Sequence, residues 1–444
     1  MLVSRMRPLT HIALVGGLLT AALGVGCGGE ESREPAPAPV PASSAPVLAE
    51  ASPAAPDLDK ALLLSFSVFP RGPDGKTSAR PGPATFVVVR REGGAWVWEA
   101  IEDPDSNVFH KVLPFDPPGA EPGLLTISGD AARLRLWRKR DGEWSAETLW
   151  APAFGGKHDR LRDLEIADLD GDGQDEIVLA THDQGVVAVG RFSDAGFEVE
   201  ELDRKPRTFV HEIEVGDLDA DGRPEIYATP SQPNRLDGDP QTGQVTRYVS
   251  ADGSAGSWKR EVFADLGLRH AKEILVADID RSGVPELYVA VEAHVENRVV
   301  RDPVEVRRFT AQSVPADRDV VAEFDDRLLR FLLPADVDGD GAPELIAAPF
   351  KSGLWLLRPS AESDAPFEAV LIDKNSSGFE HATLAADLDG DGRDELYVAA
   401  DDQGAIRRYV WTGQAFAREE IFRTDDRFRG FTWNVTETPV ELVR

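Results

Sequence analysis

The sequence predicts an all-β fold, a β-propeller in which short four-stranded sheets are arranged as blades around a central axis. Three observations predict it. An acidic loop recurs along the chain at intervals of roughly 50–60 residues. Each copy is followed by an apolar run bounded by turn residues, and no window shows a sustained helical period. We expect the propeller to span residues 58–444 with seven blades, and six and eight blades are the alternatives.

The amino-terminal segment has the layout of a secretory signal. Arg5 and Arg7 precede an apolar stretch, and small residues surround Cys27, the single cysteine of the chain. This arrangement resembles the lipobox of bacterial lipoproteins, although Gly24 stands where that family usually has leucine. The resemblance implies a lipoprotein-type signal peptide over residues 1–27 and lipidation of Cys27. A plain signal peptide and an uncleaved anchor are the alternatives.

Residues 28–57 are dominated by proline, alanine and serine, a composition that buries little and predicts a disordered, extended tether. Gly28 rather than aspartate follows the cysteine, which resembles lipoproteins sent to the outer membrane. We therefore expect a monomeric protein of the cell envelope, an outer-membrane lipoprotein that faces the periplasm or the cell surface. Its contact with the membrane would be through the lipid anchor only.

The charge of the chain excludes one class of partner. There are 78 acidic and 48 basic residues, which give a formal net charge of −30. A nucleic-acid binder needs a basic surface to meet phosphates, so we expect no nucleic-acid partner. Carboxylates at this density either repel one another or hold cations.

Five acidic loops align without gaps, and each is the centre of a unit that reads as four strands. An alternating segment precedes the loop, an apolar segment such as "ELYV" follows it, and two further strand-like segments complete the unit. The loops begin at Asp168, Asp217, Asp278, Asp336 and Asp387. An eroded sixth copy is anchored at Asp116 and keeps Glu121 as its only other acid, so we expect no ion there.

The two ends of the chain together predict the seventh blade. Residues 85–103, "TFVVVRREGGAWVWEAIED", look like the third and fourth strands of a blade, and residues 431–438, "FTWNVTET", look like its first strand. One blade shared between the termini would close the ring and remove free sheet edges.

The acidic loop has the chemistry of a calcium site. Carboxylates stand at positions 1, 3 and 5, glycine at position 6 permits a sharp turn, the main-chain carbonyl at position 7 can add a ligand, and glutamate stands at position 9. Calcium prefers such hard oxygen ligands, whereas zinc is disfavoured because no loop contains cysteine or histidine. The candidate ligands are Asp168, Asp170, Asp172, Gln174, Glu176, Asp217, Asp219, Asp221, Arg223, Glu225, Asp278, Asp280, Ser282, Val284, Glu286, Asp336, Asp338, Asp340, Ala342, Glu344, Asp387, Asp389, Asp391, Arg393 and Glu395.

An EF-hand is the alternative, and position 12 argues against it. An EF-hand needs a bidentate glutamate there and a helix on either side. The five loops instead have Leu179, Ala228, Val289, Ala347 or Val398, all inside expected strands. The pattern closely resembles the FG-GAP/VCBS repeats of integrin-α-type propellers, over about residues 107–426. That resemblance implies up to five Ca²⁺ ions, in loops between the first and second strands of the blades. Ser282 replaces an aspartate, so the third site is expected to bind more weakly.

A second pattern is a basic residue six positions before each loop anchor, which we call the basic column. Its members are His110, Arg162, His211, Lys272, Arg330 and His381. Each begins a first strand, so we expect the column to ring the central channel on the face opposite the ions. It could bind an anionic or polyhydroxylated ligand. The alternative is that each side chain bonds a carboxylate or a carbonyl of its own or the next blade.

No motif for chemistry is present: there is no HExxH pair, GxSxG elbow, phosphate-binding glycine loop or cysteine nucleophile. We expect a calcium-stabilised, membrane-tethered module that binds a protein or a glycan and is not an enzyme. One alternative is a secreted carbohydrate-active enzyme, a polysaccharide lyase or hydrolase, on the same propeller. The other is a purely structural component of the envelope.

Overall fold

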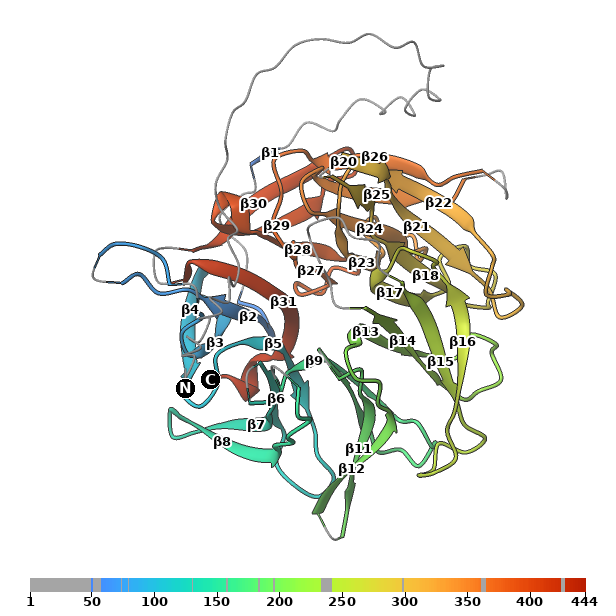
Figure 1. Ribbon diagram of the computed structural model, residues 1–444. Coiled ribbons are helices and arrows are strands. Elements are labelled where there is room, and N and C mark those ends of the chain that lie inside the picture. Colours follow the sequence, from blue (N-terminus) through green and yellow to red (C-terminus); the bar gives the residue numbers. More distant parts are fainter. Residues whose placement is uncertain are drawn as a thin grey trace, which may run out of the picture.

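The computed structural model describes residues 49–50 and 57–444, apart from residues 73, 79, 130, 157–158, 183, 195, 233–241, 298, 361–364 and 425–427. The predicted signal peptide, Cys27 and nearly all of the predicted tether lie outside these residues. In the described part of the chain, the strands form seven four-stranded antiparallel blades around a central axis (Figure 1). The predicted fold class and the preferred blade count are therefore confirmed. None of the described helices is long and apolar enough to span a bilayer.

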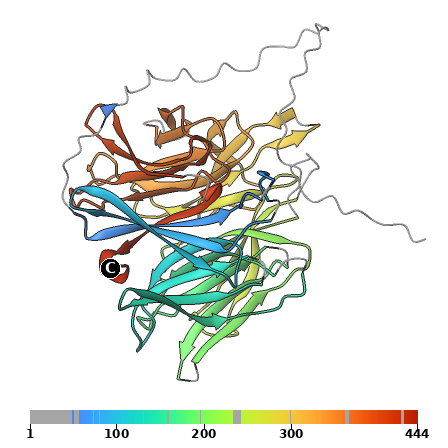
Figure 2. The same ribbon diagram turned by 90° about the vertical axis from the view of Figure 1, so that its left-hand side faces the viewer.

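Six blades are built from consecutive segments of the chain, with the first strand innermost and the fourth outermost (Figures 1 and 2). The first is β5 (Phe109–Phe115), β6 (Gly123–Ser128), β7 (Leu134–Arg140) and β8 (Glu143–Trp150); the second is β9 (Leu161–Ala167), β10 (Glu176–Thr181), β11 (Val187–Ser193) and β12 (Gly196–Asp203); the third is β13 (Phe209–Gly216), β14 (Glu225–Ser231), β15 (Gln244–Val249) and β16 (Lys259–Asp265). The fourth is β17 (Ala271–Ala277), β18 (Glu286–Val291), β21 (Val304–Phe309) and β22 (Asp319–Phe324); the fifth is β23 (Leu329–Ala335), β24 (Glu344–Pro349), β25 (Leu354–Arg358) and β26 (Glu368–Asp373); the sixth is β27 (Thr383–Ala386), β28 (Glu395–Ala400), β29 (Ala405–Trp411) and β30 (Phe416–Arg423).

The described residues also form three kinds of element outside the four strands of each blade. The hairpin β19 (His294–Glu296) and β20 (Val299–Asp302) is inserted in the fourth blade. The short strand β1 (Ala49–Glu50) pairs in parallel with the outer strand β30, so two residues of the predicted tether lie against the propeller. Two 3₁₀ turns, η1 (Asp401–Gln403) and η3 (Val440–Leu442), follow β28 and the last strand.

The seventh blade joins the two ends of the chain. The carboxy-terminal strand β31 (Gly430–Pro439) is its innermost strand and pairs with β2 (Lys60–Val68), which continues to β3 (Ala84–Glu92) and β4 (Ala95–Asp103). In Figure 1 the red β31 lies beside the blue β2. The sequence-based assignment of the first, third and fourth strands of this blade is confirmed, and β2 supplies the second.

The second strand of each blade is the most deeply buried. All six residues of β10, β18, β24 and β28 are buried, because neighbouring blades cover both faces of each sheet. This explains why the segments after the acidic loops read as continuous apolar runs rather than as strict alternation. Hydrophobic clusters accordingly join adjacent blades; one of them contains Leu125 and Ile127 of β6 with Ile177 and Leu179 of β10.

Candidate functional site

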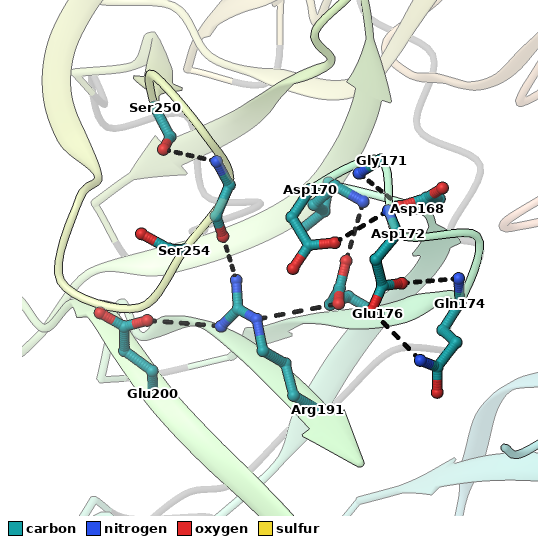
Figure 3. Close-up of polar contacts among 12 residues, drawn as sticks. Asp168, Asp170, Gly171, Asp172, Gln174, Glu176, Arg191, Glu200, Ser250 and Ser254 are labelled. Carbon is teal, nitrogen blue, oxygen red and sulfur yellow. Dashed lines mark hydrogen bonds and ion pairs between the residues drawn. The ribbon is translucent and has the colours of Figure 1, made fainter. Parts of the chain in front are cut away.

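The five acidic loops lie where the sequence places them, between the first and second strands of the second to sixth blades. In each loop the first aspartate binds the main chain of its own turn. In the first loop the two carboxylate oxygens of Asp168 accept hydrogen bonds from the amides of Gly171, at 2.7 Å, and Gly173, at 2.9 Å (Figure 3). The glycine at position 6 has a φ between +79° and +87° in all five loops, which confirms why glycine is needed there.

Carboxylate oxygens converge in every loop. Three acidic side chains of each loop place one oxygen apiece within 4.8 Å of the others. The groups are Asp168, Asp170 and Glu176; Asp217, Asp219 and Asp221; Asp278, Asp280 and Glu286; Asp336, Asp338 and Asp340; and Asp387, Asp389 and Asp391. The glutamate at position 9 belongs to the group in two loops, as Glu176 and Glu286. In the other three loops the corresponding residues, Glu225, Glu344 and Glu395, lie outside the group. Such clusters of hard oxygens fit a cation of the calcium type, and these residues would hold it.

An arginine on the third strand of each of these blades faces the glutamate at position 9, a feature that the sequence reasoning missed. The five residues are Arg191, Arg247, Arg308, Arg358 and Arg408. The nitrogen–oxygen separation is 3.8 Å for Arg191 and Glu176 and 2.6 Å for Arg358 and Glu344. Four of the five arginines are followed directly by an aromatic residue. The turns between the second and third strands differ in length, so the arginines do not align when the repeats are aligned on their acidic loops.

The arginine is a fixed cation beside each predicted calcium site. Arg408 contacts both Asp389 and Glu395. Burial nevertheless raises the pKa of Glu395 to about 7, because its effect outweighs that of Arg408. Arg191 also reaches the next blade, donating to the carbonyl of Gly253 at 2.6 Å (Figure 3). At Gly253, φ is +68° and an added Cβ would lie 2.2 Å from the Leu169 carbonyl oxygen, so this junction requires glycine.

The basic column lies at the opposite ends of the first strands, as expected, but it is not an exposed rim. Each of its six residues is at most 9% exposed. A break in strand register occurs at each of His110, Arg162, His211, Lys272 and Arg330. Such β-bulges re-aim side chains, which explains why Arg162 and the adjacent Asp163 both face the channel.

Burial also removes most of the charge that the column was expected to carry. It lowers the pKa of His110 and of His211 well below the usual value, and that of His381 to about 4. Burial likewise lowers the pKa of Lys272 well below its usual value, and its side-chain nitrogen contacts the His211 ring. Arg330 remains charged because Glu380 and Glu292 outweigh the effect of its burial and raise its pKa.

The contacts of four of the six members match the alternative interpretation, in which each side chain bonds a carboxylate or carbonyl, whereas Lys272 and His211 contact each other. His110 contacts the Leu161 carbonyl at 2.6 Å, and His381 contacts the Pro349 carbonyl at 2.8 Å. Arg330 donates to Glu380 at 2.6 Å and to Glu292 at 3.2 Å. The carboxylates that follow the column in sequence, Asp163, Glu212 and Glu273, line a cavity instead.

That cavity occupies the centre of the ring and has a volume of about 370 Å³. First strands of the second to fourth blades give it an acidic wall; the residues are Asp163, Glu165, Glu212, Glu214 and Glu273. Lys111 of β5 is the one lysine among the lining residues, and it forms ion pairs with Asp163 at 2.9 Å and with Glu165 at 2.5 Å. The facing wall, from the fifth to seventh blades, is largely apolar; its residues include Phe331, Leu333, Pro334, Leu384, Ala385 and Trp433.

Comparison with known proteins supports the repeat and the fold. The family model described as FG-GAP-like repeat matches residues 168–228 and 336–398. No curated protein matches the chain. One similar solved structure is the crystal structure of a protein from Lactobacillus plantarum, a structural-genomics target. It is 9% identical, with a TM-score of 0.51 over 86% of this chain and 99% of that chain. The protein is thus a seven-bladed β-propeller. It carries FG-GAP-like repeats at two places.

Proposed function

We propose that this protein is a calcium-stabilised β-propeller that acts outside the cytoplasm as a binding module for a protein or a glycan. A lipid on Cys27 would tether it to a membrane. The observation that carries the calcium part is the convergence of carboxylate oxygens in five equivalent loops. Four of these loops fall within the two stretches that match the FG-GAP-like repeat.

Calcium at these positions would stiffen the junctions between blades. The fifth and sixth blades already touch through their loops: the Asp336 amide donates to the Asp394 carboxylate, and the Asp394 amide donates to the Asp336 carbonyl, both at 2.9 Å. An ion in either loop neutralises carboxylates at this junction and fixes the turn that carries them. The ions therefore have a structural role, and the ligand-binding surface is formed elsewhere on the propeller.

Thermal unfolding tests the calcium proposal directly. The melting temperature of the purified protein is measured with calcium, with magnesium and with EDTA. Calcium is expected to raise it by several degrees, because a ligand that binds only the folded state stabilises that state. An unchanged melting temperature under chelation contradicts the proposal.

The tether and the binding role need separate measurements. Mass spectrometry of the mature amino terminus detects acylation of Cys27, and Cys27→Ser is expected to release the protein from the membrane fraction. A glycan array and a pull-down, each with and without EDTA, search for the ligand. Retention of Cys27→Ser in the membrane fraction contradicts the tether, and a purely structural component would bind no ligand in either screen.

A carbohydrate-active enzyme is the second candidate, and one observation favours it. In the cavity, burial raises the pKa of Glu212 well above its usual value, whereas Lys111 outweighs burial and lowers the pKa of Asp163. Carboxyl groups held in different protonation states are the usual partners in acid–base cleavage of glycosidic bonds. Incubation with a panel of polysaccharides would reveal new reducing ends or unsaturated products, and Glu212→Gln would abolish them.

A further inference from the structure

The central cavity lies apart from the calcium loops, and its lining has the chemistry of a site for a small cation. Its lining holds six carboxylates against one lysine and two arginines, Arg162 and Arg330. Both arginines already face Glu380: Arg330 at 2.6 Å and Arg162 at 3.7 Å. The five carboxylates of the acidic wall are therefore left with Lys111 as the lining cation that pairs with them.

We propose that this cavity binds a small organic amine. Its ammonium group would lie between Glu212, Glu214 and Glu273, and its carbon chain would lie against the apolar side chains of Phe331 and Leu384. This site stands apart from the calcium loops, and it requires no protein or glycan partner.

The shape and size of the cavity fit such a ligand. Small-molecule sites have volumes of roughly 300–1,000 Å³, and the value of about 370 Å³ found here is at the lower end. Carboxylates on one wall and apolar side chains on the facing wall match a molecule with a cationic head and a hydrocarbon body. The side-chain oxygen of Asn434, a lining residue, has no hydrogen-bond partner among the described residues, so it is free to accept a hydrogen bond from an ammonium group or a water.

A metal ion fits the acidic wall less well than an organic cation does. Among the described residues, every group of three acidic ligands with oxygens within 4.8 Å of one another lies in a loop, and none lies in the cavity wall. The wall carboxylates are spread over three blades. An ammonium group with three donors on a flexible chain can bridge such a spread, whereas a metal ion needs several oxygens at bonding distance.

The cavity is reached from the face that carries the calcium loops. The Asp163 side chain is 4% exposed, and that of Glu165, nearer the loop end of β9, is 29% exposed. Aromatic side chains gather at the opposite end: the Phe379 ring lies 5.0 Å from Phe431 and 6.2 Å from Phe350. A ligand would therefore enter past the loops and stop above the basic column.

The protonation of the wall supports a role in holding cations. Burial raises the pKa of Glu212, Glu214 and Glu273 well above the usual value, and neighbouring carboxylates add to the effect. Asp163, Glu165 and Lys111 face the same space from β9 and β5, and Arg162 and Arg330 lie at its floor. Without a cation, the wall keeps protons to limit repulsion. An arriving ammonium group replaces them, so binding is expected to release protons to the buffer.

Isothermal titration calorimetry of the full-length, calcium-loaded protein tests this inference. The probe is butan-1-amine, and the controls are butan-1-ol, which is neutral, and butanoate, which is anionic. We expect the amine alone to bind, with an enthalpy that depends on the ionisation enthalpy of the buffer because protons are released. No binding of the amine, or equal binding of the alcohol, overturns the inference.

Two matched variants make the test specific to the wall. Glu214→Gln keeps the acceptor for the Val276 amide, which Glu214 binds at 3.2 Å, and removes the charge. It is expected to weaken amine binding about tenfold or more, since a charge-assisted hydrogen bond is lost. Glu198→Gln on the exposed outer strand β12 is the control and is expected to leave binding unchanged.

The folding of the variants is checked independently. Glu214→Gln removes one of several crowded carboxylates, so its melting temperature is expected to equal or exceed that of the wild type. Equal affinity for butan-1-amine in Glu214→Gln and Glu198→Gln overturns the inference. The effect of EDTA on the melting temperature reports on the calcium loops separately, so failure of one proposal is distinguishable from failure of the other.

Discussion

Lys60 and Glu437 stand 377 positions apart in the chain, and their side chains form an ion pair of 2.9 Å between neighbouring strands of the seventh blade. Deletion of residues 430–444 removes β31 and leaves β2 as an open inner edge. We expect a loss of unfolding free energy comparable to the whole stability of a domain, about 5–15 kcal/mol. Urea denaturation monitored by tryptophan fluorescence measures it.

Lys60→Met removes only the half-exposed ion pair and is expected to change stability by less than about 1 kcal/mol. A truncated chain that unfolds like the intact one would refute closure by this strand.

Arg330 is expected to be a structural residue of the channel floor. Arg330→Ala leaves Glu292 and Glu380 buried without their shared cation, which is expected to lower stability by about 3–5 kcal/mol. Arg330→Lys keeps a charge and should recover part of the loss. Denaturation curves measure both variants, and binding of any identified protein or glycan is measured beside them. Weaker ligand binding by Arg330→Ala without loss of stability would instead favour a binding role for the basic column.

The five loops are expected to differ in calcium affinity. Ser282 stands where the other four loops have aspartate, so the third loop has one carboxylate fewer. Ser282→Asp is expected to raise calcium affinity, and Asp387→Asn is expected to remove one tight site. Asp116→Asn in the eroded repeat is the control and should leave the calcium titration unchanged. Identical titrations for all three variants would contradict the assignment of the ligands.

Arg408 is expected to compete with calcium for the sixth blade's loop, because it contacts Asp389 and Glu395. Arg408→Gln removes the fixed cation, so the loop without calcium loses about 3 kcal/mol as the buried Glu395 carboxylate loses its partner. The gain in melting temperature on adding calcium should then be larger than in the wild type. Scanning calorimetry in EDTA and in calcium measures both quantities. A smaller calcium-induced gain would show that the arginine assists the ion.

The stability of the fold is expected to depend on pH through Asp401, a residue that lies outside the calcium loops. Burial raises its pKa to about 7, and its carboxylate accepts hydrogen bonds from the amide, at 2.9 Å, and the hydroxyl, at 2.7 Å, of Thr432 in β31. A raised pKa means that the folded state binds more protons than the unfolded state between the usual carboxyl value and 7. Its contribution to stability therefore falls as the pH rises through this window. Asp401→Asn is expected to flatten the dependence between pH 5 and pH 8 in denaturation curves, and an unaltered slope would refute the assignment.

The repeated elements of the fold were predictable from the sequence because each blade repeats one pattern. Asp168 and its counterparts in the other loops mark the same turn, and the apolar runs after them mark strands that two neighbours cover. The closing blade was predictable from its third, fourth and first strands because propellers leave few free sheet edges. By contrast, β2 lacks an acidic loop before it, so nothing in its sequence marked it as the partner of β31.

The site was less predictable, for two physical reasons. A β-bulge leaves no mark in sequence, so the alternation rule placed Arg162 and Asp163 on opposite faces although both line the cavity. Burial then suppressed the charge of His110 and its neighbours, which a count of basic residues does not reveal. The arginines beside the loops escaped notice because the turns before them vary in length.

The closure of the ring also sets an order of events during synthesis. The strands β2, β3 and β4 are made early, but their inner partner β31 is made only after the six other blades. At about 5–20 residues per second, the edge of β2 waits on the order of 20–70 s for its partner. An open strand edge is a template for pairing with another chain throughout that interval. Conditions that slow synthesis of the segment between β4 and β31 are therefore expected to favour aggregation through the open edge of β2.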